Sequence, residues 1–250
     1  MALEQPTTTP TTACQPAALV RLIELIDAAV PLRGRELLDI GCGDGRFTAA
    51  VANRFDHVHA VDCDHAALGS FGASNRPENV AVELMSVLDL SFPDGTFDRV
   101  TAIDLLEELH DVPQALREIH RVLRPGGFVV LTTPNRLWPA PPRGYCIGGR
   151  KVPGWLLPGA TWIPDAPRRL GGARAYTRGT LHDTIVDSGL QPYASATMFP
   201  TLHSGLPTLR SKLPTLDSGE RTGWQRLASQ LESSPIGLVA QTLIFVARRA

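Results

Sequence analysis

Apolar residues follow two alternating patterns along the chain: short unbroken apolar runs, and longer stretches with the i, i+3, i+4, i+7 spacing. Unbroken runs are typical of strands buried on both faces of a parallel sheet, and the spaced stretches are typical of amphipathic helices. The runs predict strands at residues 36–40, 57–61, 80–84, 97–103, 128–133, 190–199 and 241–247. The spaced stretches predict helices at residues 16–30, 47–55, 64–74, 111–123, 177–189 and 224–232.

Strand and helix alternate from residue 36 to residue 133. Because such crossovers are right-handed, this order predicts an α/β fold with a doubly wound, mostly parallel seven-stranded sheet, closed by an antiparallel pair at one edge. Two regions depart from the alternation. Residues 1–15 are rich in Thr and Pro, and we expect a disordered tail there.

Residues 134–176 are rich in proline and glycine and hold three of the four tryptophans, Trp138, Trp155 and Trp162. This composition is too rich in proline for regular helix or strand and too aromatic for a solvated linker. We therefore expect an ordered cap inserted into a single domain that spans residues 16–250.

Length and charge narrow the function classes. A chain of 250 residues with 43% hydrophobic residues can form one well-packed domain. The net charge of −1, from 24 basic and 25 acidic residues without a basic run, argues against a nucleic-acid partner.

No run of roughly 20 apolar residues and no leader pattern is found, so we expect a cytoplasmic protein without membrane contact, as a monomer or homodimer. The four cysteines show no CxxC spacing, which indicates neither zinc nor a disulfide framework.

The most informative stretch is residues 36–47, where an apolar run breaks into the alternating glycines Gly41, Gly43 and Gly45 before a helical pattern resumes. Glycine has no Cβ, so the backbone can adopt positive φ and approach a ligand closely. N–H groups at the start of the next helix would face that ligand. The pattern predicts a cradle for a small molecule, although a tight turn alone would have the same glycines.

Several motifs, in order, resemble the class I S-adenosylmethionine-dependent methyltransferases, in particular the small-molecule group called methyltransferase type 11. Residues 37–45, Leu-Leu-Asp-Ile-Gly-Cys-Gly-Asp-Gly, resemble the first motif of that family, and residues 60–62, 88–93 and 115–127 resemble later ones. The resemblance implies S-adenosylmethionine as cofactor and methyl transfer to a small-molecule acceptor, with oxygen as the expected acceptor atom. N- or C-methylation and a non-catalytic S-adenosylmethionine-binding protein are the alternatives. An NAD-linked enzyme is disfavoured because GxGxG is followed by Arg46 and Phe47, where a dinucleotide site needs GxGxxG.

The resemblance also implies roles for single residues. Asp39 and the turn that follows it would surround the methionine part of the cofactor, and Asp62 would accept hydrogen bonds from both ribose hydroxyls. Asp89 would face the adenine amino group, although a turn cap is its ordinary alternative, and Ile103 would close the pocket. The implied cofactor residues are Asp39, Gly41, Cys42, Gly43, Asp62, Cys63, Leu88, Asp89 and Ile103.

Methyl transfer to a hydroxyl requires alignment, exclusion of water and removal of a proton. His110, after the fourth predicted strand, is the first candidate base, with Glu107 and His203 as rivals; the alternative for His110 is an exposed residue beside a helix cap. Many relatives in the resembled family have Glu-His where this chain has Glu107 and Glu108, which puts the use of a metal in doubt. Asp104, Glu107 and Glu108 could still bind a hard cation such as Mg²⁺, but we expect no metal and a solvated acidic helix face at these positions.

The tryptophans of residues 134–176 suggest an apolar or aromatic acceptor held under the cap. A lid with a small aromatic core of its own would have the same composition.

Overall fold

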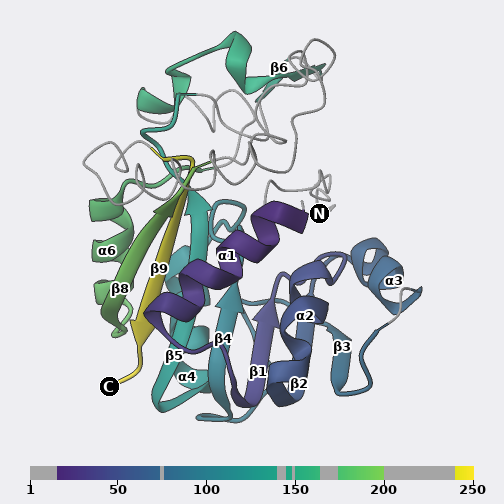
Figure 1. Ribbon diagram of the computed structural model, residues 1–250. Helices are drawn as coiled ribbons and strands as arrows, with labels where there is room; N and C mark the ends of the chain where they lie inside the picture. The colour runs from purple at the N-terminus through teal and green to yellow at the C-terminus, as the bar shows by residue number, and fades with distance from the viewer. Residues whose placement is uncertain (1–15, 74–75, 140–144, 148–149, 164–173, 200–239) are drawn as a thin grey trace, which may run out of the picture.

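The computed structural model describes residues 16–73, 76–139, 145–147, 150–163, 174–199 and 240–250 (Figure 1). Its main sheet has the strand order β3-β2-β1-β4-β5-β9-β8. Strands β1 to β5 are parallel, while β9 is antiparallel to both β5 and β8. The strands are β1 Gly34–Ile40, β2 Phe55–Asp62, β3 Val80–Leu84, β4 Phe97–Ala102, β5 Leu123–Pro134, β8 Gln191–Met198 and β9 Thr242–Arg248. The doubly wound, mostly parallel, seven-stranded sheet predicted from the sequence is confirmed.

Helices cover both faces of this sheet. The longer ones are α1 Pro16–Ala29, α2 Arg46–Val51, α3 His65–Ala73, α4 Val112–Val122 and α6 Arg178–Asp187. Helices α1, α2 and α3 share one buried cluster with Leu37 of β1, whereas α4 and α6 share a second cluster with the adjacent Leu38. Neighbouring strand residues point to opposite faces, so unbroken apolar strands are buried on both sides. None of the described helices has the length and apolar character needed to cross a bilayer.

The boundary between α2 and β2 differs from the sequence-based expectation. The helix predicted to reach residue 55 ends at Val51 and is followed by the 3₁₀ helix η2 Ala52–Arg54. Phe55 is already extended and begins β2, because Asn79 donates to the carbonyls of both Ala52 and Phe55 at 2.9 Å and closes the helix there. The stripe of apolar residues 47–55 is therefore divided among α2, η2 and β2.

The antiparallel pair lies at one end of the sheet, as expected, but it is not a hairpin. Strand β9 lies between β5 and β8 and pairs with both over its whole length. The helix predicted at residues 224–232 and the tail at residues 1–15 lie outside the described residues.

The proline-rich segment lies beyond the carboxyl ends of the parallel strands (Figure 1). It contains an antiparallel pair, β6 Tyr145–Ile147 with β7 Arg150–Val152, and the 3₁₀ helices η3 Gly154–Leu156 and η4 Ala160–Trp162. The expectation of no regular strand there is wrong, because the prolines flank these short strands and do not interrupt them.

The cap is attached to the sheet at both of its ends. Asn135 is buried and donates from its side chain to the carbonyl of Ala240 at 2.8 Å, while its main-chain N–H donates to Gln241 at 2.8 Å. At the other end, Arg174 donates from its N–H to the carbonyl of Glu107 at 3.1 Å. Both attachments lie near the edge where the parallel strands end.

Candidate functional site

The glycine turn after β1 is bonded directly to the end of β2. The N–H groups of Gly41 and Cys42 donate to the carbonyl of Val61 at 2.8 and 3.1 Å, and the N–H of Gly43 donates to Oδ2 of Asp62 at 2.9 Å. The other carboxylate oxygen of Asp62 accepts from the N–H of Asp64 at 2.9 Å. Two main-chain donors therefore hold this half-buried carboxylate in one orientation at the sheet edge.

Two glycines of the turn have different structural tasks. Gly43 has φ +54°, and a Cβ there would meet no atom within 4 Å, so its backbone borders open space. Gly45 has φ +76°, and a Cβ there would lie 2.2 Å from the ring of Phe71 on α3. Only at Gly43 does the missing side chain leave room for a bound molecule. This room lies beside the fixed Asp62 carboxylate, so the residues present fit a ligand that carries hydroxyl groups, such as a sugar.

Asp39 lies in the protein interior. It is 2% exposed, and its carboxylate accepts hydrogen bonds from the hydroxyls of Thr48 at 2.6 Å and Thr101 at 2.7 Å. Burial away from solvent raises the pKa of Asp39 to about 6. The two hydrogen bonds from the hydroxyls act in the opposite direction, but their effect is smaller. Asp39 thus joins β1, α2 and β4 beneath the turn. Its contact with the methionine part of a cofactor remains a prediction, and both of its oxygens are already engaged.

The residues expected near an adenine lie in a tight turn after β3. Leu88 is half-buried and donates from its N–H to Oγ of Ser86 at 3.2 Å, while Asp89 is exposed and donates to the carbonyl of Ser86 at 3.2 Å. Met85 donates to the main-chain carbonyl of Asp62 at 2.9 Å, which links this turn to the end of β2. The second and third motifs are therefore neighbours in space.

The remaining predicted cofactor residues differ in exposure. Ile103 is half-buried directly after β4, Cys42 is buried, and Cys63 is exposed. Burial, together with the nearby carboxylates, raises the pKa of the Cys42 thiol far above its usual range, so this residue stays a neutral thiol. The Cys42 side chain packs in the buried cluster that α1, α2 and α3 share.

Of the three predicted catalytic residues, the structure describes His110 and Glu107. His110 is exposed, beside Asp111, whose carboxylate accepts from the N–H of Gln114 at 3.0 Å and caps α4. Glu107 is only 4% exposed, and His203 lies outside the described residues. The expectation of a solvated acidic helix face is wrong, because residues 104–108 form turns in which Glu107 points inward while Glu108 is exposed.

The backbone of Asp104, just after β4, has a strained conformation that the sequence did not predict. It has φ +51°, a left-handed conformation that is uncommon for any residue except glycine. Its N–H donates to Oγ1 of Thr132, and that hydroxyl donates in turn to Oδ1 of Asp104, both at 2.9 Å. Within the described ranges, no three His, Cys, Asp or Glu side chains are grouped so that they could hold a metal ion.

Comparisons with known proteins agree with this geometry. A family model described as a methyltransferase domain matches residues 38–131. An uncharacterized methyltransferase of Mycobacterium tuberculosis is 31% identical over 167 residues, which cover 63% of this chain and 83% of that protein. The chain belongs to the class I S-adenosylmethionine-dependent methyltransferases.

Other members of this methyltransferase family give a similar result. A ubiquinone biosynthesis O-methyltransferase of Pseudomonas aeruginosa is 34% identical over 117 residues, 46% of this chain. The chain spans about half the length of that relative, 50% of it. The crystal structure of an S-adenosylmethionine-dependent methyltransferase from Mesorhizobium loti superimposes with a TM-score of 0.63 at 21% identity, covering 96% of this chain and 100% of that one. At this identity the match supports the methyltransferase fold.

Proposed function

We propose that this chain transfers a methyl group from S-adenosylmethionine to an oxygen atom of a small-molecule acceptor. The observation that carries the proposal is the Asp62 carboxylate, which the N–H of Gly43 holds beside the open side of the glycine turn. Parallel α/β sheets bind their ligands at the carboxyl ends of the strands, where this pair lies. Asp62 would accept hydrogen bonds from ribose hydroxyls, and the backbone at residues 41–43 would lie against the methionine part.

When bound, S-adenosylmethionine supplies a methyl group on a positively charged sulfur. The chain's own contribution would be alignment, exclusion of water and removal of the acceptor's proton. His110 is the candidate base because it is exposed at the edge of the sheet where β4 ends. Glu107 is a less suitable base, since its side chain is buried beneath the attachment of the cap.

The choice of oxygen as acceptor atom has support from the Pseudomonas relatives, which are named O-methyltransferases. Among the described aromatic residues of the cap, Trp162 supports an apolar or aromatic acceptor, whereas two others pack within the protein. Tyr145 is buried, and Trp138 packs edge-on against Phe199 with ring centroids 6.3 Å apart. Trp162, in contrast, is 57% exposed, so its indole is available to a ligand at the surface of the cap.

A binding screen followed by a transfer assay tests the proposal. S-adenosylmethionine and its demethylated product should raise the melting temperature of the protein, whereas NAD and NADP should not. Protein that binds the cofactor is then incubated with methyl-labelled S-adenosylmethionine and a panel of phenols, carboxylic acids, amines and carbon acids. Label in a phenol or carboxylate supports O-methylation, label only in an amine or carbon acid replaces it by N- or C-methylation, and binding without any transfer favours a non-catalytic role.

A further inference from the structure

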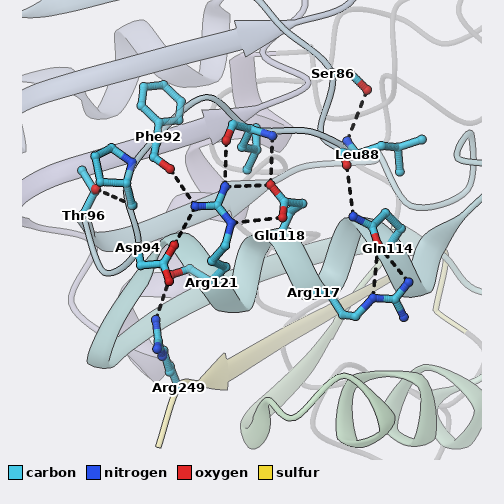
Figure 2. A network of polar contacts seen from close by, with 12 residues as sticks. Ser86, Leu88, Phe92, Asp94, Thr96, Gln114, Arg117, Glu118, Arg121 and Arg249 are labelled. Carbon is cyan, nitrogen blue, oxygen red and sulfur yellow. Dashed lines mark hydrogen bonds and ion pairs between the residues drawn. The ribbon is translucent and has the colours of Figure 1, made fainter.

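A polar ridge on helix α4 holds the segment in which the adenine-side residues lie. Residues 85–96 connect β3 with β4 and contain no strand beyond a single bridge between Ser86 and Asp89. Main-chain groups in such a segment need other partners. Figure 2 shows that side chains of α4 provide them, from Gln114, Glu118 and Arg121, one helical turn apart on the same face.

Leu90 is bonded on both of its main-chain groups. Its N–H donates to Oε2 of Glu118 at 2.9 Å, and its carbonyl accepts from Nη2 of Arg121 at 2.7 Å. In a β-sheet, a neighbouring strand would provide these two hydrogen bonds; here two side chains of α4 provide them. The Leu90 side chain is 3% exposed and packs in the same buried cluster as α4, so residue 90 is fixed by both packing and hydrogen bonds.

Arg121 uses all five of its N–H donors within this network (Figure 2). Besides the bond to Leu90, its guanidinium donates to both oxygens of Glu118 at 3.1 and 2.8 Å, to the carbonyl of Phe92 at 2.7 Å and to Asp94 at 2.9 Å. The Arg121 guanidinium also lowers the pKa of Glu118, so Glu118 remains ionised at neutral pH. The arrangement needs the planar fork of arginine, which lysine does not have.

The polar ridge is also bonded directly to Leu88, which is expected to lie beside the adenine ring. Nε2 of Gln114 donates to the carbonyl of Leu88 at 3.2 Å, two residues before Leu90. Asp89 lies between these two bonded positions and is itself exposed. The orientation of its side chain therefore depends on a main chain that α4 holds on either side.

We propose that Glu118 and Arg121 are positioning residues for the adenine end of the cofactor pocket, and that they set its preference for adenine through the main chain at residues 88–92. This inference rests on the proposed function, because it concerns the same cofactor. Neither side chain is expected to touch the ligand. Their task is to hold Leu88 and Asp89 in the conformation that recognises the base.

The test compares binding of S-adenosylhomocysteine with binding of S-inosylhomocysteine, in which an oxygen replaces the 6-amino group of adenine. Calorimetric titration gives the ratio of the two dissociation constants for wild-type protein and for the variants Arg121→Lys and Gln114→Ala. The second variant leaves the bonds of Glu118 and Arg121 to Leu90 in place. Loss of one well-placed hydrogen bond to the base should reduce the preference for adenine about fivefold. Glu24→Gln is the matched control, because it breaks another i,i+3 Glu–Arg pair, that with Arg21 on α1.

Hydrogen exchange in the peptide that covers residues 86–92 is measured in parallel. We expect faster exchange together with a reduced adenine preference in Arg121→Lys and Gln114→Ala, and neither change in Glu24→Gln. Faster exchange with an unchanged preference in both variants would overturn the inference, since the network would then only stabilise the loop. Failure of wild-type protein to bind S-adenosylhomocysteine would instead overturn the proposed function, and this inference with it.

Discussion

Asp104 and Thr132 exchange two hydrogen bonds, each 2.9 Å long, between the end of β4 and strand β5. The exchange holds Asp104 at φ +51°, a conformation that costs about 1–3 kcal/mol when nothing stabilises it. The direction in which the chain leaves β4, toward Glu107 and His110, is thus determined by one buried hydroxyl on the neighbouring strand.

Replacement of Thr132 by valine should reveal this dependence. Thr132→Val keeps the shape of the side chain but leaves the N–H of Asp104 without its acceptor, so we expect a loss of about 1–3 kcal/mol in the free energy of unfolding. Urea titration measures it. Thr133→Val is the matched control, since the buried hydroxyl of Thr133 has no hydrogen-bond partner among the described residues and should be replaceable at little or no loss. Equal losses in the two variants would show that the hydroxyl of Thr132 has no special role.

Asp62→Ala should weaken cofactor binding and leave the protein folded. Loss of a charged acceptor for hydroxyl groups reduces affinity by about 1.5–3 kcal/mol, which is roughly ten- to a hundredfold. The variant also releases the N–H groups of Gly43 and Asp64, so the turn itself should loosen. Calorimetric titration with S-adenosylhomocysteine measures the change. Asp56→Ala, near the opposite end of β2, is the control; an unchanged dissociation constant in folded Asp62→Ala would remove Asp62 from the site.

Asp39 should make the free energy of unfolding fall as pH rises, which is the reverse of the usual effect of a carboxylate. Its pKa is about 6 in the folded protein, above the value of 3.8 for a solvated aspartate, so between about pH 4 and 6 the folded state binds more protons than the unfolded state. The contribution of Asp39 to the free energy of unfolding therefore falls as pH rises through this window, by about 3 kcal/mol in total. Asp39→Asn should remove this slope.

Urea titrations at several pH values, on wild-type protein and on Asp39→Asn, measure the effect as a difference. The free energy of unfolding of the variant relative to wild type should increase from about pH 4 to about pH 7. Asp56→Asn, which removes an exposed carboxylate on β2, is the control for the loss of a charge as such. A flat difference for Asp39→Asn would mean that Asp39 titrates alike in the folded and unfolded states.

Gly45→Ala should be strongly destabilising. The new Cβ would lie 2.2 Å from the ring of Phe71 in a backbone with φ +76°, so both overpacking and strain act, and we expect a loss of about 2–4 kcal/mol. Gly72→Ala on α3 is the control, because a Cβ there meets no atom within 4 Å and alanine favours helix. Thermal unfolding of the two variants should shift in opposite directions. Similar melting temperatures for both would contradict the close contact with Phe71.

Deletion of the cap should separate cofactor binding from transfer. Replacement of residues 139–172 by a short Gly/Ser linker keeps Asn135 and Arg174, which attach the segment to the sheet. The proposed cofactor residues all precede residue 135, so affinity for S-adenosylmethionine should stay within a few-fold while methyl transfer is lost. If the folded truncated protein still methylates its acceptor at a near-normal rate, the acceptor site lies elsewhere.

The sequence predicted those features of the candidate site that depend on strand order, namely that Asp62 and the glycine turn meet. Asp62 and the glycine turn follow adjacent parallel strands, and the carboxyl ends of such strands must meet at one edge. It did not predict the environment of Asp39, because Thr101 is 62 positions away and its hydroxyl matters only once β1 and β4 pair. The inward orientation of Glu107 was missed for a similar reason: three acidic residues among the five positions 104–108 suggest exposure to solvent unless tertiary contacts override this.

Strand β9 also has a consequence for how the chain folds. It is the last strand in sequence, yet β5 and β8 flank it, and six of its seven residues are buried. A growing chain that has not yet produced residues 242–248 would leave main-chain groups of β5 unpaired and β8 without a partner strand. Such intermediates would tend to associate with one another, so the yield of native protein should depend on how quickly this strand inserts.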